Sequence, residues 1–260
     1  MRGSLESYFT QVVANDPEPG RRKTLAWRLS CFDAGLECVR YVEKHYFAIQ
    51  GKRVLDIGCA WGGHAVAFAS KGAQVFASDI NDHEFPWLRR FSNTHDLDLH
   101  ILRGNCVGLP FNDLTFDVII ALELVEHIDS VEPFAGEVAR VLRPGGICLI
   151  STPPRFRSLL WGEPHYGIRG LTILPLAWQR FVATQVLGRS HPYPITRQYT
   201  VASKVIRPFA SEGLKGAPVL RGRLCRYLSN YPLMLRAAQE VLWSFVVVVK
   251  PAVPCGGLGS

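Results

Sequence analysis

The stretch between Val54 and Gly63 constrains the fold of this 260-residue chain more than any other segment. It reads V-L-D-I-G-C-A-W-G-G, in which a hydrophobic strand passes through an acidic residue into a glycine-rich loop and then into a helix. Glycine lacks a Cβ and adopts positive φ at little cost, so such a loop lets the backbone approach a bulky ligand. The N-terminus of the following helix offers free N–H groups to negative charge. The segment therefore predicts a ligand-binding turn between a strand and a helix.

The spacing of the glycines separates two classes of ligand. A dinucleotide-binding loop reads G-x-G-x-x-G. From Asp56 to Gly62 this chain reads D-x-G-x-A-x-G, which resembles motif I, D/E-x-G-x-G-x-G, of the class I S-adenosylmethionine-dependent methyltransferases. Ala60 replaces the middle glycine of that motif. Because alanine disfavours positive φ, we expect the loop to be slightly reshaped there.

Four further segments resemble the same family and follow in the family's order. Gln74–Ile80 is a second short strand that ends in an acid, Asp79. The other three segments are Gly104–Phe111, Phe116–Ile128 and Val141–Ile150. The resemblance covers residues 50–152 and is closest to the type 11 methyltransferases, the subgroup that includes enzymes of ubiquinone and menaquinone biosynthesis.

The resemblance implies S-adenosyl-L-methionine as the cofactor and places its binding residues at strand ends. Asp56 and the loop backbone would hold the methionine end, and Asp79 would accept hydrogen bonds from both ribose hydroxyls. The predicted cofactor-binding residues are Asp56, Gly58, Cys59, Ala60, Gly62, Asp79, Ile80, Asn105, Cys106, Leu122 and Glu123.

The remaining roles concern the adenine ring and the sulfonium. The resemblance implies that Ile80 packs on the adenine and that Asn105 and Cys106 meet its edge. Asn105 stands where the family has an acid, but its amide oxygen can still accept a hydrogen bond from the adenine amino group. Leu122 and Glu123 would lie beside the sulfonium.

Strand and helix patterns alternate along the chain, which predicts an α/β fold with a Rossmann-like sheet and helices on both faces. Ligands of such sheets bind at the carboxyl ends of the strands. The resemblance implies seven strands, mostly parallel, with an antiparallel last strand inserted between strands five and six. Strands are predicted near residues 52–57, 73–78, 98–103, 116–121 and 146–151, then at Val219–Cys225 and Leu242–Val249.

Four parts follow from these patterns. Residues 1–50 are N-terminal helices that cover the pocket, and residues 51–152 form the cofactor-binding core. Residues 153–196 are an insertion, and residues 197–260 complete the core with strands six and seven. The position of the 153–196 insertion after strand five favours a substrate lid. A dimer contact and an amphipathic membrane element are the alternatives.

A general base is sought in the insertion. His165 is the first candidate because an imidazole accepts a proton near neutral pH. Tyr166 beside it would orient the substrate. His127 is the alternative base and His191 a weaker one, and a structural role for these histidines stays open, as does a reaction that needs no base.

Charge is distributed unevenly. Residues 151–230 contain twelve Lys or Arg and two Glu, a net charge of +10 against +7 for the whole chain. Such a surface is expected to meet an anionic substrate, an anionic membrane or nucleic acid, with a solvated basic face as the alternative. Arg155, Arg157 and Arg169 are candidates for binding a carboxylate or phosphate through two hydrogen bonds.

Other features narrow the class of protein. No apolar run approaches the roughly 20 residues of a transmembrane helix, and no secretory signal is visible. The seven cysteines form no C-x-x-C pair, so we predict neither a metal site nor a disulfide framework. We expect a cytoplasmic protein, with peripheral contact to the inner membrane surface as a further prediction.

Together these features predict a methyltransferase acting on oxygen or nitrogen of a small, anionic or lipid- or glycan-linked metabolite. An RNA methyltransferase is one alternative, although no RNA-binding module or N/D-P-P-Y/F tetrad supports a nucleic-acid partner. A non-catalytic protein that kept the fold is another, because Ala60 and Asn105 depart from the motifs. Glycine spacing disfavours a dehydrogenase. The substrate, the accepting atom, the pathway and the oligomeric state stay open.

Overall fold

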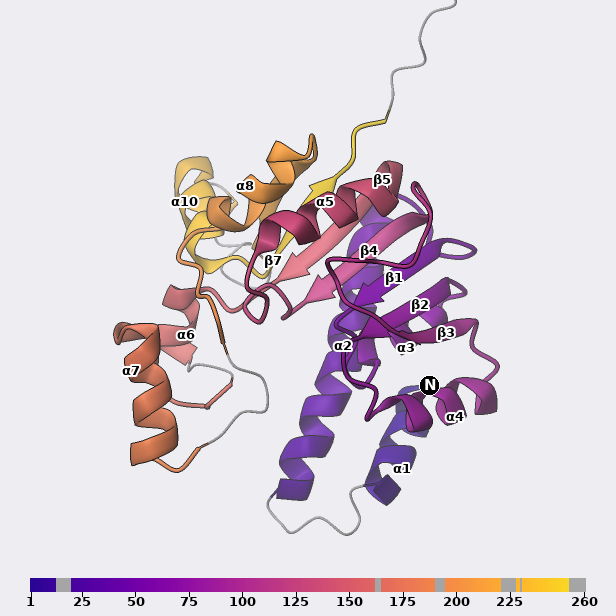
Figure 1. Ribbon diagram of the computed structural model, residues 1–260, viewed down its shortest axis with the longest axis horizontal. Helices are drawn as coiled ribbons and strands as arrows, with labels where there is room; N and C mark the ends of the chain where they lie inside the picture. Colours follow the sequence, from indigo (N-terminus) through magenta and orange to yellow (C-terminus); the bar gives the residue numbers. More distant parts are fainter. Residues whose placement is uncertain (13–19, 162–164, 190–194, 221–227, 230, 253–260) are drawn as a thin grey trace, which may run out of the picture. The chain divides into compact units, whose positions relative to one another are not determined.

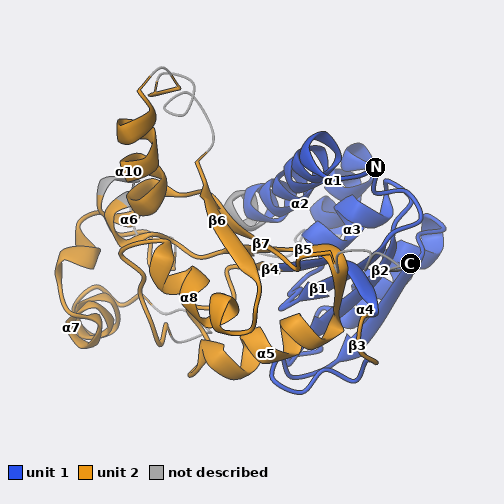
Figure 2. Cartoon of the chain, turned by 90° about the horizontal axis from the view of Figure 1, so that it is seen from above, with its two compact units in different colours: residues 1–111, 115–120 blue, residues 112–114, 121–260 orange. Residues whose placement is uncertain are grey.

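The computed structural model describes residues 1–12, 20–161, 165–189, 195–220, 228–229 and 231–252 (Figure 1). Contacts divide the chain into two compact units (Figure 2). Unit 1 comprises residues 1–111 and 115–120, and unit 2 comprises residues 112–114 and 121–260.

The strands form a seven-stranded sheet in the order β3-β2-β1-β4-β5-β7-β6, which confirms the predicted fold class. Its strands are β1 (Arg53–Ile57), β2 (Gln74–Asp79), β3 (Leu99–Arg103), β4 (Phe116–Leu122), β5 (Leu142–Ser151), β6 (Lys215–Val219) and β7 (Phe245–Val249). The helices of unit 1 are α1 (Arg2–Val12), α2 (Gly20–His45), α3 (Gly63–Ala69) and α4 (Phe85–Thr94). Unit 2 contains α5 (Val131–Val141), α6 (Arg155–Trp161), the 3₁₀ helix η1 (Leu171–Ile173), α7 (Leu176–Phe181), the π-helix η2 (Val182–Val186), α8 (Ser203–Ser211) and α10 (Pro232–Leu242).

In unit 1, β1, β2 and β3 pair in parallel. Val54 and Leu55 of β1 are fully buried, as expected for a parallel strand that is covered on both faces. Helices α2 and α3 approach each other closely at Gly35, where a Cβ would lie 2.7 Å from the Cβ of Ala67. This packing supports the carboxyl end of β1 and the loop that follows it.

Helix α1 packs on the same loop through aromatic rings. The ring of Phe9 makes an edge-on contact with Trp61 of the glycine loop, with centroids 4.9 Å apart. Trp87 of α4 completes the cluster, 4.9 Å from Phe9 and 5.5 Å from Trp61. Arg28 of α2 forms an ion pair with Glu84 at 2.6 Å. The N-terminal helices therefore hold the outer side of the loop in place.

In unit 2, β7 pairs antiparallel with both β5 and β6. This confirms the predicted insertion of the last strand between strands five and six. The predicted position of strand six was wrong: β6 is Lys215–Val219, before the predicted Val219–Cys225, and residues 221–227 lie outside the described residues. Gly216 and Pro218 read as strand breakers, but β6 is the edge strand, where a proline is tolerated.

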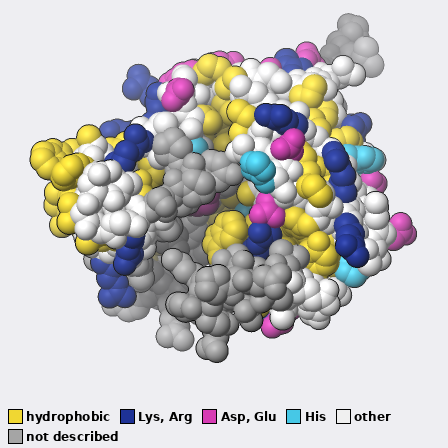
Figure 3. Space-filling view, turned by 60° about the horizontal axis from the view of Figure 1, so that its bottom comes forward, with side chains coloured by type: hydrophobic (Ala, Val, Ile, Leu, Met, Phe, Trp, Pro, Cys, Tyr) yellow, Lys and Arg dark blue, Asp and Glu magenta, His cyan; other side chains and the backbone are white. Residues whose placement is uncertain are grey.

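The described part of the insertion has a small hydrophobic core of its own, made of Tyr166, Leu171, Ala183 and Ile195. Apolar side chains also gather on its surface, at the left edge of Figure 3, where α7 lies in Figure 1. Among the described residues, no helix is long and apolar enough to cross a bilayer.

Candidate cofactor and acceptor sites

The glycine loop after β1 is left-handed at three alternate positions. Gly58, Ala60 and Gly62 have φ of 72°, 46° and 84°. At Gly62 a Cβ would also lie 2.6 Å from Cδ2 of Leu88, so only glycine fits there. Alanine itself takes up positive φ at position 60. An L-residue pays about 1–2 kcal/mol for that conformation, so the loop tolerates the substitution at a cost in strain.

Hydrogen bonds tie the loop to the end of β2. The backbone N–H of Gly58 donates to the carbonyl oxygen of Ser78 at 2.8 Å. The N–H of Ala60 donates to Oδ2 of Asp79 at 2.8 Å, and the N–H of Asn81 donates to Oδ1 of the same carboxylate at 2.9 Å. A carboxylate accepts about four hydrogen bonds, so Asp79 retains acceptor capacity for two hydroxyls.

Asp56 lies beneath the loop and is buried. Burial raises its pKa from 3.8 to about 7, the hydrogen bond from the Ala65 N–H opposes the rise, and the charge of Asp79 adds to it. Its Oδ2 has no hydrogen-bond partner among the residues that the structure describes. A buried carboxyl with a vacant acceptor suits a cationic group, so the site fits the ammonium end of S-adenosylmethionine.

The predicted adenine contacts lie in the same unit. Ile80 follows Asp79 directly and is 59% exposed, which leaves an apolar surface available to a flat ring. Oδ1 of Asn105 accepts a hydrogen bond from the Val107 N–H at 3.2 Å, so one lone pair is used locally and one remains. Cys106 is partly buried, and burial raises the pKa of its thiol.

Leu122 and Glu123 belong to unit 2, at the end of β4. Glu123 has a φ of 55°, and its Oε1 accepts a hydrogen bond from Oγ of Ser151 at 2.6 Å. The Glu123 N–H donates to the backbone and side-chain oxygens of Ser151. This pair fixes the turn after β4 to the end of β5. Nine of the eleven predicted cofactor residues thus lie in unit 1, and the role of each remains a prediction.

The two candidate bases lie together in unit 2. Nε2 of His165 is 3.2 Å from Nε2 of His127, and 4.0 Å from Oε1 of Glu126. Glu126 is 1% exposed, and its carbonyl oxygen accepts hydrogen bonds from the N–H and Oγ1 of Thr196. The short contact between the rings requires that one nitrogen donate and the other accept, so the histidines can share a proton.

Sequence reasoning missed Glu126, although the adjacent Glu-His pair in the Phe116–Ile128 segment was a signal for it. The ligand atoms of Glu126, His127 and His165 lie within 4.8 Å of one another, a spacing that a divalent cation can bridge. The expectation of no metal stays a prediction. Tyr166 is buried in the core of the insertion, and its predicted role in orienting a substrate stays a prediction. His191 lies outside the described residues.

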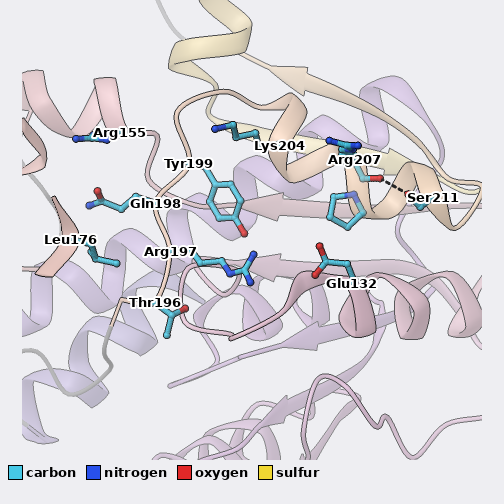
Figure 4. A pocket seen from close by; sticks show the side chains of 11 residues that line it. Glu132, Arg155, Leu176, Thr196, Arg197, Gln198, Tyr199, Lys204, Arg207 and Ser211 are labelled. Atoms are coloured by element: carbon cyan, nitrogen blue, oxygen red, sulfur yellow. Dashed lines mark hydrogen bonds between the residues drawn. The ribbon is translucent and has the colours of Figure 1, made fainter.

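A basic cleft of about 830 Å³ opens in unit 2 (Figure 4). Four of its eleven lining residues are arginine or lysine, and Glu132 is the one acid among them. The lining residues are Glu132, Arg155, Leu176, Thr196, Arg197, Gln198, Tyr199, Lys204, Arg207, Pro208 and Ser211. Arg197 and Gln198 also line a cavity of about 10 Å³ that touches His165 and Glu126. The cleft and this small cavity at His165 therefore share two lining residues.

The charged side chains of the cleft differ in whether they already have partners within the protein. The Ser130 hydroxyl lowers the pKa of Glu132, with a smaller contribution from Arg197, so Glu132 stays ionised. The guanidinium of Arg155 donates hydrogen bonds to the carbonyl oxygens of Thr172 and Ile173.

Lys204 and Arg207 sit three residues apart on one face of α8, and within the described residues neither forms an ion pair. They leave positive charge available to a ligand. Of the other predicted anion-binding arginines, Arg169 is exposed outside the cleft lining, and the side chain of Arg157 lies outside the description.

Comparison with known proteins agrees with this geometry. Residues 55–150 match the family model for a methyltransferase domain. The ubiquinone biosynthesis O-methyltransferase of Rickettsia typhi is 32% identical over 120 residues, which cover 46% of this chain and 48% of that protein. The sterol 24-C-methyltransferase erg6 of Schizosaccharomyces pombe is 34% identical over 112 residues, 40% of this chain and 30% of that protein. The matched region thus spans less than half the length of these relatives.

A solved structure extends the likeness of the fold. The S-adenosylmethionine-dependent methyltransferase from Mesorhizobium loti superposes with a TM-score of 0.56 and 15% identity, over 84% of this chain and 99% of that one. The motifs and the domain match confirm the predicted family and cofactor for residues 55–150. Residues 55–150 of this chain belong to the class I S-adenosylmethionine-dependent methyltransferases.

Proposed function

We propose that this protein transfers a methyl group from S-adenosylmethionine to an oxygen or nitrogen of a small anionic metabolite, free or linked to a lipid or glycan. The observation that carries the proposal is the loop after β1. There Asp79 accepts a hydrogen bond from the Ala60 N–H, and the buried Oδ2 of Asp56 has no hydrogen-bond partner among the described residues. This arrangement has the shape and charge to hold a cofactor with a cationic end and a ribose.

When bound, the cofactor would supply an electrophilic methyl group on a sulfonium. Asp56 would pair with the ammonium, Asp79 would accept the ribose hydroxyls, and Ile80 would cover the adenine. The remaining task of the protein is to orient the acceptor and to remove its proton. His165 would take that proton, and the contact with His127 would let the charge spread to a second ring.

The basic cleft supports an anionic acceptor. Lys204, Arg207 and Arg197 all line the cleft, and charge-assisted hydrogen bonds from such donors bind phosphate or carboxylate strongly. Because the cleft adjoins the cavity at His165, an acceptor held there by its anionic group would have its other end near the candidate base. The similar relatives act on a ubiquinone precursor and a sterol by name, so a lipid-linked acceptor is part of the proposal.

Isothermal titration of the protein with S-adenosylmethionine and S-adenosylhomocysteine tests the cofactor site. We expect Asp79→Ala to lose binding, because both oxygens of its carboxylate face the loop. Asp82→Ala is the matched control, since Asp82 is an exposed acid three residues away and should bind as wild type does. A folded wild-type protein that binds neither ligand would favour the non-catalytic alternative.

The RNA alternative predicts a different result. A labelled RNA should then shift with the protein, and the shift should weaken steeply with salt. Methyl transfer to small phosphorylated or carboxylated metabolites, without an RNA shift, is the result expected from the proposal.

A further inference from the structure

The insertion after β5 exposes an apolar surface that its own folding does not require. Five large side chains from η1, α7, η2 and the residue after η2 are between 49% and 68% exposed. We define this α7 patch by Ile173, Trp178, Phe181, Val186 and Leu187. Monomeric proteins seldom leave large apolar groups clustered in water without a partner.

Helix α7 is apolar on its inner side as well. Leu176 and Val182 pack against the core of Tyr166, Leu171, Ala183 and Ile195. Gln179 is fully buried and hydrogen-bonds the Leu174 carbonyl and Gln198. The inner side therefore already has its packing partners, whereas the apolar side chains of the outer side face solvent. The exposed apolar side chains of α7 and η2 therefore have no role in the core of the insertion.

The outer side carries aromatic rings at helical spacing. Trp178 and Phe181 lie three residues apart, and their rings contact edge to face with centroids 5.8 Å apart. Tryptophan and phenylalanine of this kind favour the boundary between lipid headgroups and acyl chains. Ile173 and Leu187 extend the apolar surface on either side.

The charge around the patch has a single sign. No acid occurs between Glu163 and Glu212 in the sequence, whereas six Lys or Arg do. Arg169, Arg180 and Arg189 of this stretch are exposed. Arg189 also donates to the Tyr166 carbonyl at 2.6 Å, which holds the segment in place. An exposed apolar surface on a segment whose charged residues are all cationic complements the negative potential of an anionic membrane leaflet.

We propose that the α7 patch docks this protein on the surface of an anionic lipid bilayer, with Trp178 and Phe181 entering the interface. A partner protein would have to offer an acidic rim around an apolar groove, whereas an anionic bilayer supplies both properties over any area. None of the residues of the α7 patch is among the predicted cofactor-binding residues.

Co-sedimentation with vesicles tests the proposal. Wild-type protein should bind vesicles of phosphatidylglycerol and phosphatidylcholine, and should bind pure phosphatidylcholine at least tenfold more weakly. Trp178→Ser with Phe181→Ser should reduce binding to the anionic vesicles by tenfold or more. Leu233→Ser with Met234→Ser is the matched control, since both are exposed apolar residues on α10 outside the patch, and it should bind as wild type does.

A charge pair completes the design. Arg180→Glu should weaken vesicle binding and its dependence on salt, whereas Lys44→Glu on α2 changes the net charge equally and should have no effect. Circular dichroism and titration with S-adenosylhomocysteine check that each variant is folded.

Equal binding of the patch and control variants would overturn the proposal. A second result would also overturn it: the wild-type protein does not bind anionic vesicles but forms a dimer, and Trp178→Ser with Phe181→Ser abolishes that dimer. The patch would then bind a second copy of the chain.

Discussion

Oδ2 of Asp79 accepts a hydrogen bond from the backbone N–H of Ala60 at 2.8 Å, across 19 positions of the sequence. This bond joins the end of β2 to the residue of the loop that carries the most strain, since Ala60 has φ of 46°. The carboxylate therefore stabilises a left-handed alanine and also presents its free lone pairs where a ribose is expected. One residue thus serves both the shape of the loop and its predicted ligand.

Ala60→Gly should stabilise the protein by about 1 kcal/mol, because glycine adopts positive φ without the clash of a Cβ. The measurement is the free energy of unfolding in urea. Ala65→Gly, in α3 of the same unit, is the control and should destabilise by about 1 kcal/mol, because a helix interior disfavours glycine. Destabilisation of both variants by similar amounts would show that Ala60 is not strained.

Asp56 should make the protein less stable as the pH rises. Its pKa is raised by burial from 3.8 to about 7, so the folded state favours the neutral carboxyl. The stabilisation is then complete below pH 3.8 and is lost as the pH rises through about 7, by an upper bound of about 4 kcal/mol. The fall in unfolding free energy between pH 5 and pH 8 should disappear in Asp56→Asn.

His64 titrates in the opposite sense, because burial lowers its pKa to about 4 and its stabilising contribution is lost as the pH falls from 6.5. The difference between wild type and Asp56→Asn at each pH isolates the carboxyl. Parallel pH profiles for the two proteins would contradict the assignment, and the exposed Asp82→Asn serves as the control for a general effect of charge.

Lys204→Ala with Arg207→Ala should weaken the binding of inorganic pyrophosphate by about 30-fold or more, because two charge-assisted hydrogen bonds of roughly 1–3 kcal/mol each are lost and only Arg197 and Arg155 remain as cations of the cleft. Titration calorimetry with pyrophosphate measures this. Arg40→Ala with Lys44→Ala removes a similar basic pair from α2 and should leave the affinity unchanged. The affinity for S-adenosylhomocysteine should stay constant in both, and equal losses in both would indicate a long-range effect of net charge.

His165→Gln should lower the rate of methyl transfer by about 100-fold while the cofactor still binds, because general bases contribute roughly two to four orders of magnitude. The rate is followed as S-adenosylhomocysteine released with an acceptor found among phosphorylated and carboxylated metabolites. The acid limb of the pH profile should also vanish. His45→Gln, an exposed histidine on α2, is the control, and a variant of His165 with an unchanged pH profile would exclude it as the base.

Local patterns in the sequence were enough for the central elements of the fold. Strands β1 to β4 begin and end close to their predicted positions, because their apolar runs are bounded by glycine or acids. Edge strand β6 was misplaced, because Gly216 and Pro218 look like a turn unless the position at the sheet edge is known. The positive φ of Ala60 does not follow from its residue type, because that conformation is held by a hydrogen bond to Asp79, which is distant in sequence.

By itself, the sequence identified the family, the positions of strands β1 to β4 and the residues of the cofactor loop, because each of these depends on spacings within a few residues of one another. The place of the last strand in the sheet came only from the family resemblance. Only the tertiary structure decided that Glu126, His127 and His165 meet, that cations from α8 and the 196–199 segment form one cleft, and that Trp178 and Phe181 remain outside the core. These arrangements join residues that lie far apart along the chain. Such contacts are selected by the packing of whole elements, which no local pattern encodes.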